Sequence, residues 1–441
     1  MSLHYQYADM HCDTLLHGLG KGVNDIYDMP DAMLDLKRMA EANVLCQFFA
    51  VFFPPRPEML TPQEREKRLK AGRPEMPPDE ELFSNAVRLM QDSFAAHKDV
   101  IRQAYCFDDV MKNKEQGLIS GVLTVEDGRM VNGSFDRLEQ LAKTGVRAIA
   151  LTWNFENCFG APNSRDPKIM SKGLSAFGKE AIEAMNELGI LVDVSHLSDG
   201  GFYDVAKISK KPFVATHSDC RALAAHPRNL TDDMIRLLAQ KGGVSGINFA
   251  PAFLDDTQGN NTSRISDMVR HVKHFIEIGG EDCVGIGTDF DGLEHRGIDL
   301  KEALRIQELA QRLENLAALD EGILHLRVDD GIHIALAIAH ILIAQAVPLL
   351  RQHAQGFAQQ RQGRGMHGDL AGLGAEHNAL HAQNVADIHR FEIGIDVLAD
   401  VLAAHIRLNL ALAVHHVNEG RLAHDSAAHH AARDADGLPL Q

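Results

Sequence analysis

The first 297 residues alternate short runs rich in β-branched and aromatic residues with longer stretches whose apolar residues recur at helical spacing. This alternation is typical of repeated β/α units, in which helices connect parallel strands. Eight such runs can be counted, and eight parallel strands indicate an α/β fold of the (β/α)8 TIM-like barrel type. The predicted strands cover residues 7–13, 44–51, 118–126, 146–153, 190–196, 213–217, 243–249 and 283–289.

The composition changes abruptly after residue 297. We expect residues 1–297 to form the barrel and residues 298–441 to form an atypical C-terminal extension rich in Ala, His and Leu. The extension has one lysine against sixteen before it, and it holds fourteen of the 24 histidines without zinc-ligand spacing. We interpret it as an aberrant, frameshift-like or poorly ordered end of the chain. An intact helical accessory domain is the alternative.

The charge of the chain narrows its choice of partners. A net charge of -17 disfavours nucleic acid, because phosphate binding requires clustered Lys and Arg. A small-molecule substrate fits this acidic composition better.

The cysteines and the hydropathy pattern indicate a cytoplasmic protein. Six scattered cysteines without a CxxC pair are typical of free thiols in a reducing compartment. The N-terminus lacks the basic and apolar regions of a signal peptide. The most apolar segment, residues 332–350, contains two His, one Gln and one Pro, which argues against a membrane-spanning helix. We therefore expect no membrane partner.

Polar side chains with metal-binding or acid–base chemistry lie at the ends of five predicted strands. The C-terminal ends of barrel strands meet at one mouth, so these side chains should face a common centre. They are His11 and Asp13 after the first strand, then Glu126, His196, His217 and Asp289.

This set of residue types predicts a pair of metal ions. His11 and Asp13 are two residues apart, and alternate strand residues point the same way, so both can reach one ion. Glu126 has two oxygens and could bridge ions about 4 Å apart, while His196 and His217 offer neutral imidazoles to the second ion. A water between two Zn²⁺ ions would be acidified to hydroxide and could attack a carbonyl, which is hydrolysis.

Longer motifs resemble the membrane (renal) dipeptidase family, in its bacterial cytoplasmic type, over about residues 5–297. They occur in the family's order and spacing: Leu123-Thr-Val-Glu-Asp-Gly128, Val192-Asp-Val-Ser-His-Leu197, Ala215-Thr-His-Ser218, His226-Pro-Arg-Asn-Leu230, Gly242-Gly-Val-Ser-Gly-Ile-Asn-Phe249 and Gly285-Ile-Gly-Thr-Asp-Phe-Asp-Gly292.

The resemblance implies a dinuclear zinc dipeptidase with a metal-dependent hydrolase barrel, and it assigns a role to each matched residue. His11 and Asp13 would bind the first Zn²⁺, Glu126 would bridge as ligand and catalytic residue, and His196 and His217 would bind the second Zn²⁺.

The same resemblance implies how a dipeptide would be held and cleaved. Asp289 would be the general acid/base that passes a proton to the leaving amine. Arg228 would pair with the substrate's terminal carboxylate, because a planar guanidinium offers two N–H groups to two oxygens. Relatives are commonly dimers, so a homodimer is expected.

One segment departs from the family pattern. Many members have a His after the Leu-Thr of the fourth strand, whereas this chain reads Leu151-Thr-Trp-Asn154. Trp153 and Asn154 are therefore candidate substrate-binding residues. The developing oxyanion could be held by zinc, Asn154 or Asn157, or Trp153 could simply pack at the barrel rim.

Two other functions stay open. A related cyclic amide hydrolase or deaminase would more often carry HxH on the first strand and a metal-bridging Lys after the fourth, where this chain has HxD and Trp153. A catalytically defective metal-binding scaffold would result if the extension replaced the helix that seals the eighth strand against the first.

Overall fold

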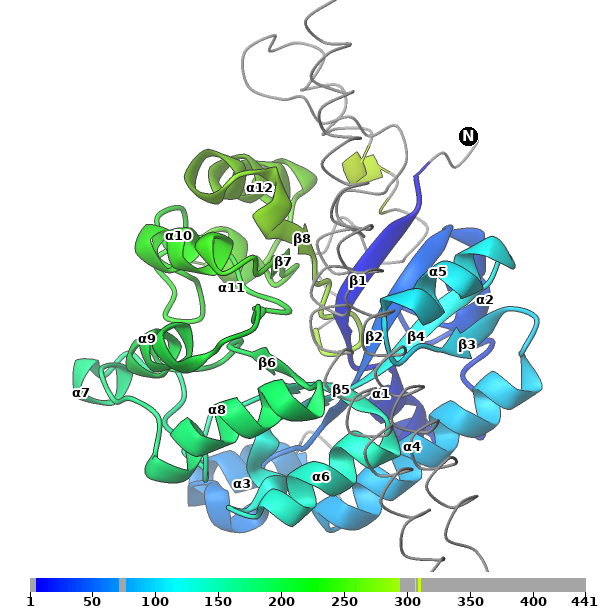
Figure 1. Cartoon of the computed structure of the whole chain (residues 1–441), viewed down its shortest axis with the longest axis horizontal. Coiled ribbons are helices and arrows are strands. Elements are labelled where there is room, and N and C mark those ends of the chain that lie inside the picture. Colours follow the sequence, from blue (N-terminus) through cyan, green and yellow to red (C-terminus); the bar gives the residue numbers. More distant parts are fainter. Residues whose placement is uncertain (1–4, 71–76, 258, 294–305, 307, 311–441) are drawn as a thin grey trace, which may run out of the picture. The chain divides into compact units, whose positions relative to one another are not determined.

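The structure is a computed structural model, and it describes residues 5–70, 77–257, 259–293, 306 and 308–310 (Figure 1). All of these residues belong to one compact unit, Met1–Arg351. Nearly all of the predicted extension, residues 298–441, lies outside the described residues, and both interpretations of it stay predictions.

A parallel sheet forms the centre of the fold, as the sequence predicts. Its strands follow the order β6-β5-β4-β2-β1-β8-β7, and β3 pairs with β4 outside this path. The bounds are β1 (Tyr7–Cys12), β2 (Val44–Phe52), β3 (Ile101–Gln103), β4 (Ile119–Glu126), β5 (Val146–Ala150), β6 (Leu191–Asp193), β7 (Ser245–Ile247) and β8 (Val284–Ile286). The three-residue β3 was not predicted, because so short a segment with one buried residue carries no alternation.

The ring closes between β6 and β7 through the segment predicted as the sixth strand. Val214 bridges Asp193 of β6, and Ala215 bridges Ser245 of β7, both in parallel sense. The backbone N–H of Val194 donates to the Val214 carbonyl, and that of Gly246 donates to the Ala215 carbonyl, each at 2.8 Å. When the segment around Val214 and Ala215 is included, the eight predicted strands form a (β/α)8 barrel, which confirms the predicted fold class.

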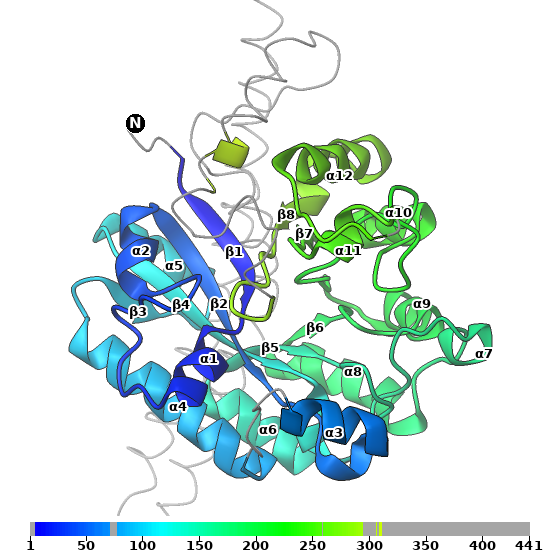
Figure 2. The same ribbon diagram turned by 180° about the vertical axis from the view of Figure 1, so that it is seen from behind.

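Helices follow the strands and surround the ring (Figures 1 and 2). Their boundaries follow ordinary capping chemistry: α8, for example, begins after Ser175, which accepts a hydrogen bond from the Gly178 N–H, and ends at Gly189 with φ 69°. Within the described ranges, no helix combines the length and apolar character needed to cross a bilayer. The helices are α1 (Thr14–Lys21), α2 (Leu36–Glu41), α3 (Pro62–Lys70), α4 (Asp79–Ala96), α5 (Phe107–Glu115), α6 (Phe135–Thr144), α7 (Pro167–Met170), α8 (Ala176–Leu188), α9 (Asp199–Ile208), α10 (Asp232–Gln240), α11 (Pro251–Leu254) and α12 (Ile265–Gly279), with 3-10 turns η1 (Pro57–Met59), η2 (Gly128–Val131) and η3 (Glu281–Cys283).

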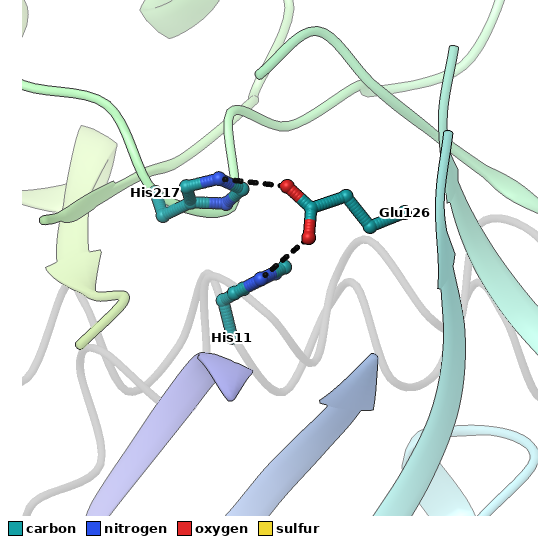
Figure 3. Close-up of side chains that lie close together, drawn as sticks. All are labelled: His11, Glu126 and His217. Atoms are coloured by element: carbon teal, nitrogen blue, oxygen red, sulfur yellow. Dashed lines mark ion pairs between the residues drawn. The ribbon is translucent and has the colours of Figure 1, made fainter. Parts of the chain in front are cut away.

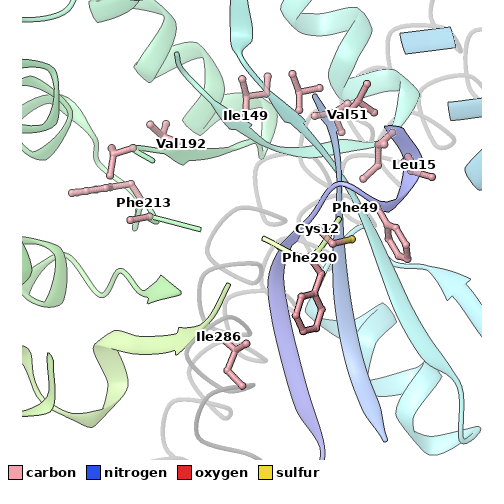
Figure 4. Packing of buried hydrophobic residues seen from close by; sticks show 14 of the residues in the cluster. Cys12, Leu15, Phe49, Val51, Ile149, Val192, Phe213, Ile286 and Phe290 are labelled. Atoms are coloured by element: carbon pink, nitrogen blue, oxygen red, sulfur yellow. The ribbon is translucent and has the colours of Figure 1, made fainter. Parts of the chain in front are cut away.

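The buried strand residues divide into two clusters, because successive strand side chains point to opposite faces. A large cluster, which includes Phe49, Ile149 and Val192, joins the strands to the helices (Figure 4). A smaller cluster contains one or more residues from almost every barrel strand and fills the barrel interior. Its members include Met10, Phe48, Val122, Ala148, Leu191, Val214 and Val244. The polar residues at the strand ends lie beyond this smaller apolar cluster.

Candidate metal centre

Glu126, the last residue of β4, lies among three histidines, and Figure 3 shows it between two of them, His11 and His217. Its Oε2 is 3.4 Å from Nε2 of His11. Its Oε1 is 3.0 Å from Nε2 of His196 and 3.6 Å from Nε2 of His217. All four residues are buried. The two oxygens of one carboxylate therefore face different histidines, which is the arrangement that a bridging ligand requires.

Asp13 and Asp289 lie on the His11 side of this cluster. From Nε2 of His11, Asp13 Oδ2 is 3.8 Å away and Asp289 Oδ1 is 4.0 Å away. The reason predicted for Asp13 is wrong, because β1 ends at Cys12 and Asp13 is the N-cap of α1, with φ -101° and ψ 20°. In addition, the register of β1 shifts between Asp9 and Cys12, as in a β-bulge, which alters the direction of the intervening side chains. His11 and Asp13 converge through this irregular backbone rather than through strand alternation.

The hydrogen bonds behind His217 and His196 fix which ring nitrogen faces the cluster. The Thr216 hydroxyl donates to Asp193 Oδ2 at 2.5 Å, so its oxygen accepts from Nδ1 of His217 at 2.8 Å. Asn154 Oδ1 lies 3.1 Å from Nδ1 of His196 and likewise accepts from it. With the proton on Nδ1 in both rings, each Nε2 presents a lone pair. Outer hydrogen bonds of this kind commonly orient metal-binding histidines.

The Nε2 atoms of His196 and His217 lie close together and face the same carboxylate oxygen. Nε2 of His196 lies 3.1 Å from Nε2 of His217, and both face Oε1 of Glu126. Two bare nitrogens and a carboxylate oxygen repel one another in a buried place unless a cation lies between them. The donor set of two imidazoles and one carboxylate suits Zn²⁺.

The pKa shifts leave His196 and His217 neutral and His11 charged. Burial alone would lower the pKa of His11, but the charge of Glu126 and the hydrogen bond with Asp13 raise it well above its ordinary value, so a metal ion would have to displace the proton on this ring. Burial lowers the pKa of His196 to about 4 and holds the pKa of His217 well below its ordinary value, so both rings are neutral near pH 7. Burial alone would raise the pKa of Glu126, but the His11 charge and the histidine hydrogen bonds hold it well below its usual range. Burial raises the pKa of Asp289 to about 7, a value suited to a general acid/base.

The part of the cluster around His11 and Asp13 also suits a cation. Asp13 Oδ1 is buried and has no hydrogen-bond partner among the described residues. Gly292 follows the Asp289 loop, and a Cβ there would collide with both Asp13 Oδ2 and Asp289 Oδ1. One ligand atom each from His11, Asp13 and Asp289 lies within 4.8 Å of the other two, as also holds for His11, Glu126 and His217. A glycine at position 292 therefore allows both carboxylates to lie this close to the backbone.

Two residues of the centre have left-handed backbone conformations. His196 has φ 67° and Asp289 has φ 60°. Non-glycine residues rarely adopt this region, and such strain persists where the surrounding structure enforces it, often at functional sites. The backbone thus turns sharply at both positions.

Arg228 is a buried cation beside His217, one of the predicted metal ligands. It is 5% exposed, and its guanidinium donates to the Ser218 hydroxyl at 3.1 Å and to the His217 carbonyl at 3.0 Å. Its Cζ lies 5.4 Å from the centre of the Phe253 ring. Its Nε has no hydrogen-bond partner among the described residues. The residue predicted to bind a carboxylate therefore retains an unused N–H next to the cluster.

The comparison with known proteins identifies the family. A model of the membrane dipeptidase family, peptidase family M19, matches residues 2–331. The chain belongs to this family. It is accordingly a metallo-dipeptidase, as the resemblance of its motifs implies. The match extends past residue 297, at which the sequence places the change in composition.

The chain is also similar to individual proteins in sequence and in fold. The chain is 37% identical over 192 residues to an uncharacterized protein from the pqqA 5′ region of Klebsiella pneumoniae, covering 42% of this chain and 70% of that one. It resembles the crystal structure of dipeptidase AC, a metallopeptidase of family M19, with a TM-score of 0.63 and 26% identity over 77% of this chain and 99% of that one. It also resembles a metallopeptidase of Rhodobacter sphaeroides liganded with a phosphinate mimic of the dipeptide L-Ala-D-Ala, with a TM-score of 0.62, 27% identity and the same coverage.

The segment that departs from the family pattern lies beside the centre. The Trp153 ring centre is 6.1 Å from that of His196 and 5.0 Å from that of Phe52, and Asn154 is exposed and contacts His196. Asn157 behaves differently, because its amide donates to Asp127 and to the Leu151 carbonyl, both at 2.8 Å. Both N–H groups are thus used, which removes Asn157 from the candidates for holding the oxyanion.

Sequence reasoning missed one buried histidine and the polar supports of the site. No motif singles out His271, which is fully buried, accepts from the Cys220 N–H and contacts the Leu254 carbonyl. Asp9, Asp193 and Asn248 were not singled out, although all three are buried. The signal that could have revealed them is a polar residue inside an otherwise apolar strand.

Proposed function

We propose that the centre holds two Zn²⁺ ions, one on His11 and Asp13 and one on His196 and His217, with Glu126 bridging them. The observation that carries this proposal is the pair of Nε2 atoms of His196 and His217, which lie 3.1 Å apart and both face the same carboxylate oxygen of Glu126. Bound there, the ions would act as Lewis acids and lower the pKa of a water, which provides hydroxide to attack the peptide carbonyl.

We propose that Asp289 moves the proton in this reaction. Peptide hydrolysis takes one water, breaks the C–N bond and leaves a carboxylate and an ammonium group, so the protons of the water must travel to the leaving nitrogen. Asp289 Oδ1 faces His11, and burial places the pKa of this carboxyl near 7, where it can both accept and release a proton. Its charged form could also hold the ammonium group of the substrate.

Arg228 would bind the free carboxylate of a dipeptide. The guanidinium is buried, always charged and oriented by Ser218 and His217, and its Nε–H is unused. A carboxylate would satisfy this donor and balance the buried charge. A terminal carboxylate two residues from the amino end is what distinguishes a dipeptide from a longer chain.

Trp153 and Asn154 would contact the rest of the substrate. The ring centres of Phe52 and Phe155 lie 5.0 and 6.0 Å from the ring centre of Trp153, which itself lies next to His196. All three rings are partly buried. We propose that they contact one side chain of the substrate. Asn154 is held near the second ion by His196 and would place its amide beside the reacting carbonyl.

We further propose a cytoplasmic protein that acts on dipeptides, without nucleic acid or membrane partners, and that forms a homodimer. All six cysteines are described and none is in a disulfide, as expected in a reducing compartment. Size-exclusion chromatography with light scattering would test the dimer directly.

Hydrolysis by the purified, zinc-loaded protein tests the function. We expect cleavage of Gly-Leu, Ala-Ala and L-Ala-D-Ala with about two Zn²⁺ per chain. Glu126→Ala should abolish cleavage and reduce bound zinc, whereas Glu139→Ala, an exposed carboxylate paired with Lys143 on α6, should change neither. Two zinc ions bound without turnover would instead support the metal-binding scaffold. Turnover of cyclic amides but not dipeptides would support the other enzyme class.

A further inference from the structure

Asn248 links the barrel wall to Asp289. It follows β7 directly and is fully buried. Its backbone N–H donates to Oδ1 of Asp219 at 3.1 Å, and Asp219 is itself fully buried. Its side chain spans to the neighbouring stave, where Nδ2 donates to Oδ2 of Asp289 at 3.1 Å. The residue is therefore fixed at its backbone and at its amide.

The orientation of the Asn248 amide follows from its second contact. The Ala250 backbone N–H donates to Oδ1 of Asn248 at 2.7 Å, a contact to the residue two positions on. A backbone N–H can only donate, so the accepting atom must be the amide oxygen. The nitrogen then faces Asp289 and can only donate to it. The direction of the Asn248–Asp289 hydrogen bond is thus determined by the chain itself.

This hydrogen bond makes the two oxygens of Asp289 unequal. Oδ2 is occupied by the Asn248 donor, which leaves Oδ1 to exchange a proton. Oδ1 is also the oxygen that faces His11 at 4.0 Å and lies close to Gly292 and to Asp13 Oδ2. The backbone of Asp289 is left-handed, and such a conformation persists where surrounding contacts enforce it.

We propose that Asn248 is a positioning residue for proton transfer: it holds Asp289 so that Oδ1 takes the proton from water and delivers it to the leaving amine. This inference rests on the proposed function. It does not make Asn248 a metal ligand or a substrate contact.

Two variants test the proposal. Asn248→Ala removes both side-chain contacts. Asn248→Ser keeps an oxygen that can accept from the Ala250 N–H but is too short to reach Asp289. We expect both to lower kcat for Ala-Ala about 10- to 100-fold, as a misplaced catalytic group does, with KM within about twofold and zinc content unchanged. Asn186→Ala is the matched control, because Asn186 is a buried asparagine whose side chain accepts from Lys210 and Lys211, away from the centre.

A double-mutant cycle separates positioning from a structural effect. In the Asp289→Asn background, Asn248→Ser should cause little further loss of kcat, because the two residues act on one step. A kcat within twofold of wild type for Asn248→Ser, or a full additional loss in the double variant, would overturn the proposal. If the wild-type protein cleaves no dipeptide, the proposed function itself fails, and this inference with it.

Discussion

The two halves of the barrel hold their parts of the centre by different means. In the first half, β1, β2, β4 and β5 have 6, 9, 8 and 5 residues, and β2 pairs with β4 over seven consecutive residues. In the second half, β6, β7 and β8 have three residues each, and the stave around Val214 and Ala215 is held by isolated bridges.

In the second half of the barrel, where fewer backbone hydrogen bonds join the strands, buried polar side chains bond to the backbone instead. Oδ1 of Asp193 accepts from the backbone N–H groups of Ser195 and Thr216, at 2.9 and 3.0 Å. Asp9 reaches across from β1 and accepts from both the N–H and the hydroxyl of Thr288. The first half thus relies on strand pairing and apolar packing. The second half, which carries His196, His217, Arg228 and Asp289, relies on side-chain hydrogen bonds to the backbone.

The largest expected effect is loss of the metal. Chelation should reduce kcat/KM by on the order of 10³-fold or more, because the ions supply several kcal/mol of stabilisation to the transition state, and zinc should restore it. The halves should differ in zinc content: His217→Ala should keep about one Zn²⁺ per chain, whereas Glu126→Ala should lose both. Zinc analysis after dialysis measures this. Full activity in the chelated protein would contradict the metal centre.

The next largest effect distinguishes the side-chain hydrogen bonds of the second half from the strand pairing of the first half. Thr216→Val removes the hydroxyl that fixes the His217 tautomer, and we expect zinc affinity at the second site to fall about 10- to 100-fold. Thr124→Val is the control, because Thr124 is a buried threonine on the long strand β4 and should change affinity by less than about threefold. Titration with a competing zinc chelator distinguishes them. Equal effects would mean that the contrast between the halves does not extend to metal binding.

A smaller effect is expected for the aromatic residues at the mouth. Trp153→Ala should lower kcat/KM about fivefold for dipeptides with an aromatic side chain, because one ring contact contributes about 1 kcal/mol. Cleavage of Gly-Gly should stay within about twofold. Phe135→Ala, an exposed ring on α6, serves as the control. An equal loss for both dipeptides would show that Trp153 does not select side chains.

The smallest effect concerns stability in the second half. Burial lowers the pKa of His271 to about 4, so between pH 6.5 and pH 4 the unfolded chain binds a proton that the folded chain does not. The free energy of unfolding should therefore fall as pH falls, by about 1 kcal/mol between pH 6 and pH 5.

Urea unfolding of the metal-free protein at these two pH values measures this term. His271→Gln should show a correspondingly smaller drop, since glutamine does not titrate. The same drop in both proteins would assign the pH dependence to other groups.

The fold could be predicted from the sequence because each barrel strand is a buried apolar run, and the clustering of the candidate site residues could be predicted because they come directly after those runs. The geometry at the centre could not. Asp13 lies beyond the end of β1, and His196 and Asp289 turn through left-handed backbone that no local pattern indicates. Supports such as Asn248 depend on contacts between staves that are 41 residues apart.

The seam between β1 and β8 has a consequence for synthesis of the protein. Thr288 bonds to Asp9 across 279 residues, and the Asp13 N–H donates to the Phe290 carbonyl, so the two ends of the barrel sequence are joined at the active centre. A nascent chain that has not yet emerged from the ribosome beyond Gly292 cannot assemble Asp289 with His11 and Asp13. Peptidase activity would therefore arise only once the whole barrel has been made, and truncated products would be inert toward the dipeptide pool of the cell.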